Sequence, residues 1–167
     1  MLQIGRSLVR LRFRLCTSRH RTTAAVKMSV KMNVIVAVSE NMGIGINGGL
    51  PWRLKKEMAY FRRMTTYTND SSKQNAVIMG RKTWDSIPAK HRPLAGRINI
   101  VLSRQNLILG PNVAVCNSLD NVLQRLQESP LAGTIESAWI IGGSSAYKDA
   151  LASPHCFRIY LTKILKT

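Results

Sequence analysis

Runs of apolar residues alternate with helical patterns along this chain, and this alternation constrains the fold more than any other feature. Several of the strand-like runs are apolar on both faces. Strands of that kind lie in the middle of a sheet that helices cover. We therefore predict an α/β fold with a mainly parallel central sheet flanked by helices. The predicted strands are residues 33–38, 75–79, 98–102, 113–116, 138–141 and 158–165, and the predicted helices are residues 53–66, 82–86, 119–128 and 145–152.

The length of the chain bounds its organisation. With 167 residues, of which 45% are hydrophobic, the chain is long enough for one domain of ordinary size. It contains no apolar run of the length that a membrane-spanning helix needs.

Its cysteines are isolated and lack the spacing of zinc ligands, so we expect neither a disulfide framework nor a metal site. They are Cys16, Cys116 and Cys156.

The basic charge is concentrated at the start of the chain. Residues 1–31 contain six Arg, two Lys and no acid, so they carry 8 of the 17 net positive charges. On a helical wheel the apolar residues of this segment share a sector of about 60°, with arginines opposite. An Arg-rich amphipathic segment without acids is typical of a mitochondrial targeting peptide. We therefore divide the chain into a basic leader, residues 1–31, and a folded domain, residues 32–167.

The predicted helix 53–66 carries a carboxylate among apolar residues. At about 100° per residue, Met58 and Phe61 share one face, and Glu57 falls inside that face. A carboxylate aimed at a core must be paired, protonated or reserved for a ligand, because its desolvation without a partner costs several kcal/mol. Three uses of Glu57 therefore stay open: it meets an Arg of another element, its side chain extends to the rim of the core where water solvates the carboxylate, or it binds a ligand with an amidine-like edge. A glycine-rich loop ending in Leu50-Pro51-Trp52 precedes the helix, as a lid over a pocket would.

Three strand ends carry residues suited to phosphate. A glycine and two cations follow the second predicted strand, a serine and an arginine follow the third, and two glycines and two serines follow the fifth. Glycine lets the backbone approach a ligand closely, free N–H groups at a helix start bind anions, and the arginine fork binds oxyanions. Each signal alone is weak, but together they indicate a ligand with several phosphates, bound across the carboxyl ends of the strands. The motifs are Gly80-Arg81-Lys82-Thr83, Ser103-Arg104 and Gly142-Gly143-Ser144-Ser145.

These motifs, in this order, resemble those of dihydrofolate reductase of the animal type, from about residue 32 to the last residue. The resemblance implies an NADPH-dependent oxidoreductase of folate and one-carbon metabolism. Such an enzyme reduces 7,8-dihydrofolate to 5,6,7,8-tetrahydrofolate, with a hydride going to C6 and a proton to N5. Its ligands would be dihydrofolate and antifolate-like small molecules. The protein would be a monomer, and nucleic acid would not be a main partner. Further motifs that carry the resemblance are Val34-Ile35-Val36-Ala37-Val38, Asn41-Met42-Gly43-Ile44-Gly45, Arg92-Pro93-Leu94 and Ile140-Ile141-Gly142-Gly143.

The resemblance also implies roles for single residues. Glu57 would hydrogen-bond the aminopyrimidine edge of the pterin, supported by Trp52 and Thr162 through water, and Arg97 would bind the glutamate carboxylate of folate. The Gly142-Gly143 peptide bond would be cis. The residues implied in catalysis are Leu50, Trp52, Glu57 and Thr162. Those implied in substrate binding are Ile35, Val36, Glu57, Met58, Phe61, Ile87, Arg97, Ile141 and Thr162. Those implied in NADPH binding are Ala37, Ile44, Gly48, Arg81, Lys82, Thr83, Ser103, Arg104, Gly143, Ser144, Ser145 and Tyr147.

Two departures from the family pattern bear on these expectations. Position 49 is Gly where animal relatives usually carry Asp, a change that affects the loop rather than the chemistry. The chain ends at Thr167, directly after the predicted strand 158–165, so we expect the sheet to lack the last two strands of the family. Two other functions stay open. One is a non-catalytic relative that folds poorly or binds ligand weakly, and the other is a basic RNA-binding protein.

Residues 1–31 fused to a fluorescent reporter are expected to carry it to mitochondria, because amphipathic arginines without acids match a targeting segment. Microscopy of the fusion measures this, and a leader with its arginines replaced by glutamine is the control. A diffuse cytosolic signal from the unchanged leader would favour the alternative that translation starts at Met28 or Met32 and that the protein is cytoplasmic.

Overall fold

The computed structural model describes residues 30–165 of the chain. The predicted leader lies outside the described residues, apart from its last two positions. All six predicted strands and all four predicted helices are present in the described part, together with one short 3-10 helix, η1 (Ala89–His91).

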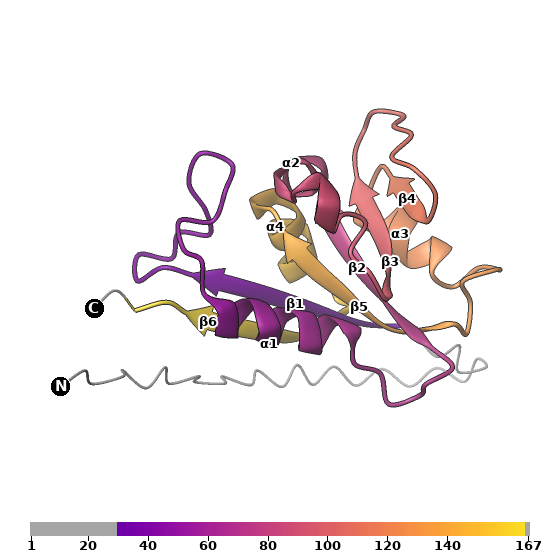
Figure 1. Cartoon of the computed structure of the whole chain (residues 1–167). Coiled ribbons are helices and arrows are strands. Elements are labelled where there is room, and N and C mark those ends of the chain that lie inside the picture. Colours follow the sequence, from indigo (N-terminus) through magenta and orange to yellow (C-terminus); the bar gives the residue numbers. More distant parts are fainter. Residues whose placement is uncertain (1–29, 166–167) are drawn as a thin grey trace.

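One six-stranded sheet forms the centre of the molecule (Figure 1). Its strands are β1 (Lys31–Val38), β2 (Gln74–Gly80), β3 (Arg97–Leu102), β4 (Val113–Cys116), β5 (Ile135–Gly142) and β6 (Cys156–Lys163). Their order is β4-β3-β2-β5-β1-β6, and every neighbouring pair is parallel. The parallel arrangement explains the apolar runs, because inner strands are covered on both faces. In β2, five consecutive residues are buried.

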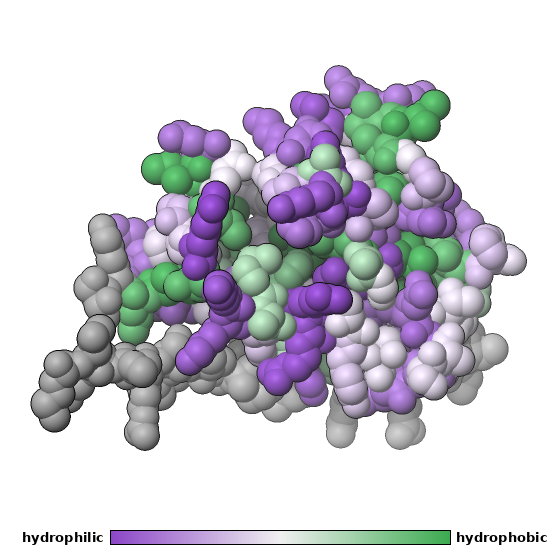
Figure 2. Space-filling view, viewed as in Figure 1, coloured by the Kyte–Doolittle hydropathy of each residue, from purple (hydrophilic) through white to green (hydrophobic). Residues whose placement is uncertain are grey.

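Helices cover both faces of the sheet. They are α1 (Lys55–Thr66), α2 (Arg81–Ser86), α3 (Leu119–Arg125) and α4 (Ser144–Ala152). The first two pack on one face, in a cluster with Trp84 and Trp139, and α1 lies in front of the sheet in Figure 1. The other two pack on the opposite face, where Val122 and Ala146 contact the inner strands. Figure 2 shows that hydrophilic side chains gather over the outer surface of α1.

Apart from β4, every strand and α-helix differs from the sequence prediction by one to three residues at one or both ends, and three elements serve as examples. α1 begins at Lys55 rather than at residue 53, because Leu54 has extended backbone angles (φ −104°, ψ 104°). α3 ends at Arg125 rather than at residue 128, and turns follow it. β6 begins and ends two residues earlier than predicted. Periodicity locates the middle of an element, whereas caps and local turns decide its ends.

β6 forms one edge of the sheet and pairs with β1. Its apolar residues Phe157, Ile159 and Leu161 are 44%, 42% and 39% exposed. They occupy alternate positions and so lie on one face of the strand. The sheet of the described residues therefore has six strands, as predicted, and the last of them has an apolar side open to solvent.

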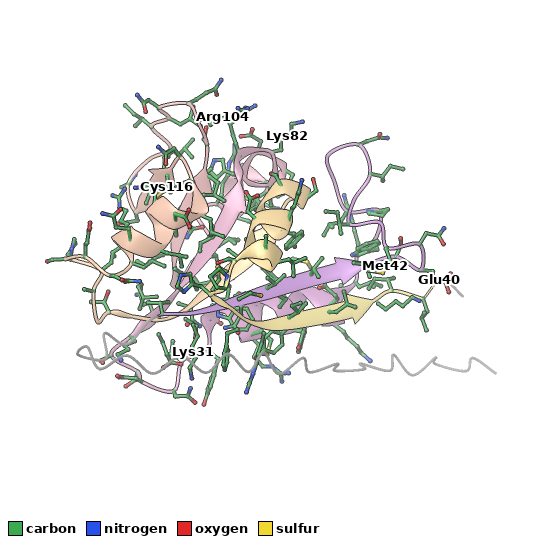
Figure 3. The ribbon with its side chains drawn as sticks, turned by 180° about the vertical axis from the view of Figure 1, so that it is seen from behind. Lys31, Glu40, Met42, Lys82, Arg104 and Cys116 are labelled. Carbon is green, nitrogen blue, oxygen red and sulfur yellow. The ribbon has the colours of Figure 1, made fainter. Side chains whose placement is uncertain are left out.

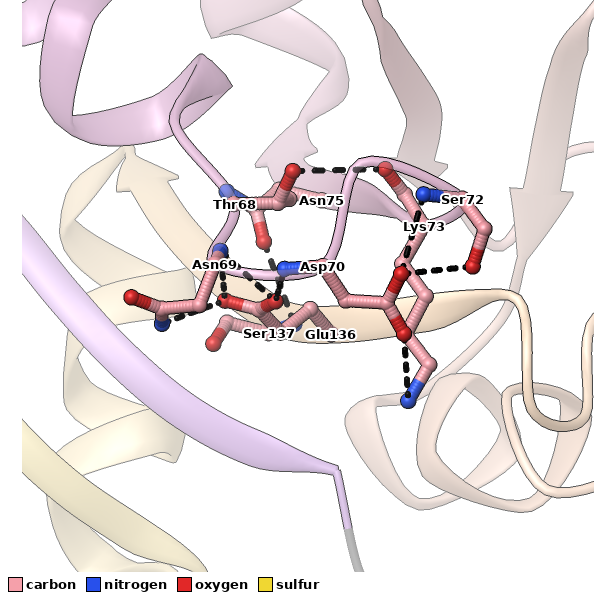
Figure 4. A network of polar contacts seen from close by, with 8 residues as sticks. All are labelled: Thr68, Asn69, Asp70, Ser72, Lys73, Asn75, Glu136 and Ser137. Carbon is pink, nitrogen blue, oxygen red and sulfur yellow. Dashed lines mark hydrogen bonds and ion pairs between the residues drawn. The ribbon is translucent and has the colours of Figure 1, made fainter.

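One carboxylate of β5 anchors the loop between α1 and β2 (Figure 4). Glu136 accepts hydrogen bonds from the backbone N–H groups of Asn69 and Asp70, each 2.9 Å long, and from the side-chain amide of Asn69 at 3.1 Å. Beside it, the buried Asn75 side chain accepts a hydrogen bond from the backbone N–H of Ser137 (3.1 Å). The backbone hydrogen bonds to Glu136 lower the pKa of its carboxyl. The folded state therefore favours the ionised form.

Glu136→Gln is expected to lower the free energy of unfolding at pH 7 by about 1 kcal/mol, because an amide does not reproduce charge-assisted hydrogen bonds. Since folding lowers the pKa of Glu136, its contribution is present above the ordinary value of 4.5 and is lost as the pH falls further. Urea unfolding at pH 7 and at pH 3 measures the difference, which should shrink at pH 3. Glu40→Gln, in an exposed loop, is the control. An equal loss at both pH values would contradict this account.

Candidate functional site

The three predicted phosphate motifs meet at the carboxyl ends of neighbouring strands. β2 lies between β5 and β3. Its last residue, Gly80, is in register with Leu102 of β3, and the residue before it is in register with Gly142 of β5. Figure 3 shows the side chains of Lys82 and Arg104 at this same end of the molecule. Open α/β sheets bind their ligands at this edge.

The turns after β2 and β5 contact each other, and glycine makes this contact possible. A Cβ on Gly80 would lie 3.7 Å from the backbone nitrogen of Gly143. A Cβ on Gly142 or on Gly143 would lie 3.3 Å from the hydroxyl oxygen of Thr83. Gly142 also has a φ of 132°, which residues with a side chain rarely adopt. The peptide bond between the two glycines is cis, as the resemblance implies. The two turns thus meet in one close backbone contact without side chains, the glycine surface.

The start of α4 presents backbone N–H groups at this glycine surface. Gly143 is the N-cap, and no side chain of the described residues caps the helix. The first backbone bond of the helix runs from the N–H of Tyr147 to the carbonyl of Gly143 (3.0 Å). The N–H groups of Ser144, Ser145 and Ala146 therefore have no partner within the helix. Such groups attract anions, so this helix start suits phosphate oxygens.

Cations surround the glycine surface, and Asp85 holds one of them. Arg81, the first residue of α2, donates from Nη1 to the Oδ2 atom of Asp85 over 3.2 Å. Lys82 and Arg104 are exposed and belong to none of the ion pairs between described residues. The hydroxyl of Ser103 accepts a hydrogen bond from the backbone N–H two residues later (3.1 Å), at the end of β3. The site therefore offers both paired and free cations to an anionic ligand.

Glu57 is a half-buried carboxyl on α1 with no ion-pair partner among the residues that the structure describes. The arginine of another element, one of the alternatives left by the sequence, is not found there. Burial raises the pKa of Glu57 above its ordinary value of 4.5. Burial also raises the pKa of Tyr147, and the charge of Glu57 raises it further, so these groups lie close together. The Tyr147 hydroxyl donates to the carbonyl of Ile35 (3.0 Å). Glu57 therefore keeps its hydrogen-bonding capacity for a ligand.

Thr162 and Trp52, the residues expected to support Glu57, lie in different surroundings. Thr162 of β6 is in register with Ala37 of β1. It lies two residues after Tyr160, which packs against the cluster on the α1 side, so both occupy that face of the sheet. The indole N–H of Trp52 is buried and has no hydrogen-bond partner among the described residues. Because an unpaired buried donor is costly, this N–H suits a bridging water or a ligand.

Arg97 is held in place at the other end of α1. It donates from Nη1 to the hydroxyl of Thr65 (2.8 Å) and from Nε to the carbonyl of Ala95 (3.1 Å). Burial lowers the pKa of Arg97, and the charge of Arg62 lowers it further. No ion pair between described residues includes Arg97. Its guanidinium is thus desolvated, oriented and open to a carboxylate.

The spacing along α1 sets the length of a ligand that would reach both charged groups. Glu57 and Thr65, the partner of Arg97, are eight residues apart on one helix. At a rise of 1.5 Å per residue this separation is about 12 Å. A ligand that contacts Glu57 at one end and Arg97 at the other must therefore be extended.

Apolar residues expected to contact the substrate lie on the α1 side of the sheet, on α1 itself and on the loop before it. Phe61, Ile87 and Ile141 pack against the buried cluster on the α1 side of the sheet. Leu50 and Met58 are 52% and 49% exposed. Partly buried and exposed apolar residues side by side are expected in the wall of an open cleft.

The side chain of Val36 does not belong to this wall. Ile35, its neighbour, is part of the cluster on the α1 side, and Val34 is part of the cluster on the other side. Because side chains alternate along a strand, that of Val36 points away from α1. Only its backbone can contact a ligand along α1.

The loop after β1 contains a tight turn. Ile46 and Gly49 exchange backbone N–H···O bonds, both 2.9 Å long. The two residues between them, Asn47 and Gly48, have positive φ angles of 49° and 77°, as a type I′ turn requires. Ile44 and Gly48, both expected to contact the cofactor, therefore lie on a loop built around a tight turn. Figure 1 shows this loop rising from the end of β1.

Two residues of the site, Asp85 and Thr65, are not among those expected from the sequence. Asp85 is four residues after Arg81 on a helix, a spacing that predicts an ion pair and would have identified it. Thr65 is 32 residues away from Arg97. No local pattern connects them, so only the structure brings them together.

A separate hollow of about 760 Å³ lies at the amino ends of the strands. Its lining includes Asn33, Glu136 and Arg158 but none of the predicted site residues. It is therefore not part of the candidate site.

Within residues 30–165, no helix has the length and apolarity to cross a membrane, and no three His, Cys, Asp or Glu side chains are grouped to hold a metal ion.

Comparison with known proteins gives a consistent result. The family model described as "Dihydrofolate reductase" matches residues 31–167. The dihydrofolate reductase of Aedes albopictus is 50% identical over 139 residues, which cover 82% of this chain and 75% of that protein. That of Mus musculus is 51% identical over 138 residues, covering 81% and 73%. The solved structure of Schistosoma mansoni dihydrofolate reductase has a TM-score of 0.75 and 43% identity, and covers 82% of this chain and 75% of that chain.

Glu57→Gln is expected to raise the melting temperature of the ligand-free protein at pH 7. A group whose pKa is raised by folding stabilises the fold below its unfolded pKa, and this contribution is lost as the pH rises through the folded pKa. Ionised Glu57 therefore destabilises the protein at pH 7, and the uncharged amide removes that cost. Thermal unfolding at several pH values measures the difference, which should vanish below the ordinary value of 4.5. Glu40→Gln is the control, and a lower melting temperature for Glu57→Gln at pH 7 would disprove the account.

Proposed function

Because this chain belongs to the dihydrofolate reductase family, of the animal type, we propose that it reduces 7,8-dihydrofolate to 5,6,7,8-tetrahydrofolate with NADPH, in folate and one-carbon metabolism. The observation that carries the proposal is Glu57, a half-buried and unpaired carboxyl beside a phosphate-binding edge. We further propose that the protein acts as a monomer and binds antifolate-like small molecules. Its location, mitochondrial or cytoplasmic, depends on whether residues 1–31 act as a targeting segment.

The residues at the carboxyl ends of β5, β2 and β3 fit NADPH. Gly142 and Gly143, where a Cβ would lie 3.3 Å from Thr83, leave the turn without side chains, so a diphosphate can approach the backbone closely. The free N–H groups at the start of α4 complement its charge. When bound, NADPH supplies the hydride that C6 of the pterin receives. We assign the 2′-phosphate to Arg81, Ser103 and Arg104, and the rest of the cofactor to Ala37, Ile44, Gly48, Lys82, Thr83, Gly143, Ser144, Ser145 and Tyr147.

The space along α1 fits dihydrofolate. The pterin lies at Glu57, and the glutamate carboxylate lies at Arg97, whose partner Thr65 is about 12 Å further along α1. Arg97 is pre-oriented by Thr65, so its guanidinium can bind the carboxylate without losing further freedom. Phe61, Ile87 and Ile141 exclude water from the rings between these ends. The remaining contacts are assigned to Leu50, Met58 and the backbone of Ile35 and Val36.

Glu57 orients the pterin and controls its proton affinity. Its carboxylate accepts hydrogen bonds from the aminopyrimidine edge, and its negative charge stabilises the positive charge that the ring gains when N5 is protonated. Water is the immediate proton donor to N5, because Glu57 binds the opposite side of the ring system. Trp52 and Thr162 hold the carboxylate through water, a role that the unpaired indole N–H of Trp52 supports. The charge of Glu57 is therefore required for the chemical step.

Saturable oxidation of NADPH that depends on dihydrofolate is expected of the purified full chain. Glu57→Gln should leave the dissociation constant of NADPH nearly unchanged and slow single-turnover hydride transfer by orders of magnitude, because the amide does not balance a protonated pterin. The fluorescence of bound NADPH measures binding, and Glu40→Gln is the control. Near-normal turnover of Glu57→Gln would show that the carboxylate has a structural role only. Binding without turnover by the unchanged chain would favour a non-catalytic relative.

A further inference from the structure

Asp85 is an isolated acid in a basic region of the chain. It is the one acidic residue between Asp70 and Asp120, a stretch that contains Arg81, Lys82 and Arg104. These cations follow β2 and β3, whose carboxyl ends are in register. A carboxylate at this place reduces the positive field that an anionic ligand meets.

Asp85 is paired with the first cation of α2. The Nη1 atom of Arg81 lies 3.2 Å from Oδ2 of Asp85, with the two residues four apart on the helix. Their side chains are 45% and 51% exposed, so solvent and a ligand both reach the pair. An exposed pair of this kind is weak enough for a competing anion to replace.

A second arginine holds Asp85 from the other side. The Nη1 atom of Arg92 lies 3.9 Å from Oδ1 of Asp85. Arg92 is itself fixed, because the same Nη1 donates to the carbonyl of Trp84 (3.0 Å) and its guanidinium stacks on the Trp84 ring, 5.5 Å from the centroid. Trp84 is buried in the core. Asp85 therefore lies within reach of an arginine fixed on the core, and it hydrogen-bonds Arg81, which makes no other ion pair among the described residues.

We propose that Asp85 sets how strongly this protein prefers a 2′-phosphorylated adenine nucleotide, because it holds Arg81 in an ion pair that the 2′-phosphate must replace. This inference rests on the proposed function, which assigns Arg81 to the 2′-phosphate of NADPH. Asp85 acts through Arg81 and is a positioning residue. Its carboxylate lowers the affinity for a ligand that carries the 2′-phosphate and has no effect on a ligand that lacks it.

Asp85→Asn in the full chain tests the proposal, with calorimetric titration of adenosine 2′,5′-bisphosphate and of 5′-AMP. The variant is expected to bind the bisphosphate about three- to fivefold more tightly, the size of an exposed ion pair, and to bind 5′-AMP as the unchanged chain does. The gain should decrease as salt is added. Asp85→Ser should give the same result, and Asp85→Glu should restore the original affinity.

Glu128→Gln is the matched control, since it removes one negative charge beside Ile98, at the amino end of β3. An equal gain in this control would attribute the effect to net charge and overturn the proposal. Weaker binding of the bisphosphate by Asp85→Asn would also overturn it, because Asp85 would then orient Arg81 for the phosphate. Equal affinity of the unchanged chain for the bisphosphate and 5′-AMP would instead contradict the assignment of NADPH in the proposed function.

Discussion

The contact between the turns after β2 and β5 is the constraint on which the candidate site depends. These strands are neighbours in a parallel sheet, so their carboxyl ends lie at one edge. Glycines at positions 80, 142 and 143 let the turns meet, and a side chain at either of the last two would press on Thr83. The same turns begin α2 and α4. One packing requirement therefore positions the backbone N–H groups of one helix beside the cations of the other.

Glu57 differs from these glycines, because its position lowers the stability of the fold and is explained by function. Burial raises the pKa of its carboxyl, and no basic residue of the described chain offsets the desolvation. Arg97 is a cation in a similar environment. Burial lowers its pKa, and no acid of the described residues pairs with it. Two unpaired charges, one on α1 and one held by Thr65 about 12 Å further along that helix, are poorly explained by stability. They are well explained by a ligand that carries a hydrogen-bonding edge at one end and a carboxylate at the other.

Much of this arrangement follows from local patterns in the chain. Runs such as Val77-Ile78-Met79 are apolar on both faces, which indicates inner strands, and glycines directly after them indicate turns with exposed backbone. The prediction was wrong at the start of α1, where Leu54 is extended, and at the end of α3. It did not indicate that the side chain of Val36 faces away from α1. Periodicity reports which residues are buried but not which face of a sheet a given helix covers.

The sequence by itself determined the elements, their alternation, the turns at the strand ends and the unusual position of Glu57, because each depends on residues close together in the chain. Tertiary structure decided the pairs that make the site specific. Thr65 holds Arg97 from 32 residues away, and Tyr147 holds the Ile35 carbonyl from 112 residues away. Such contacts depend on strand order, register and helix packing. These are properties of the whole sheet, and no local spacing of residues encodes them.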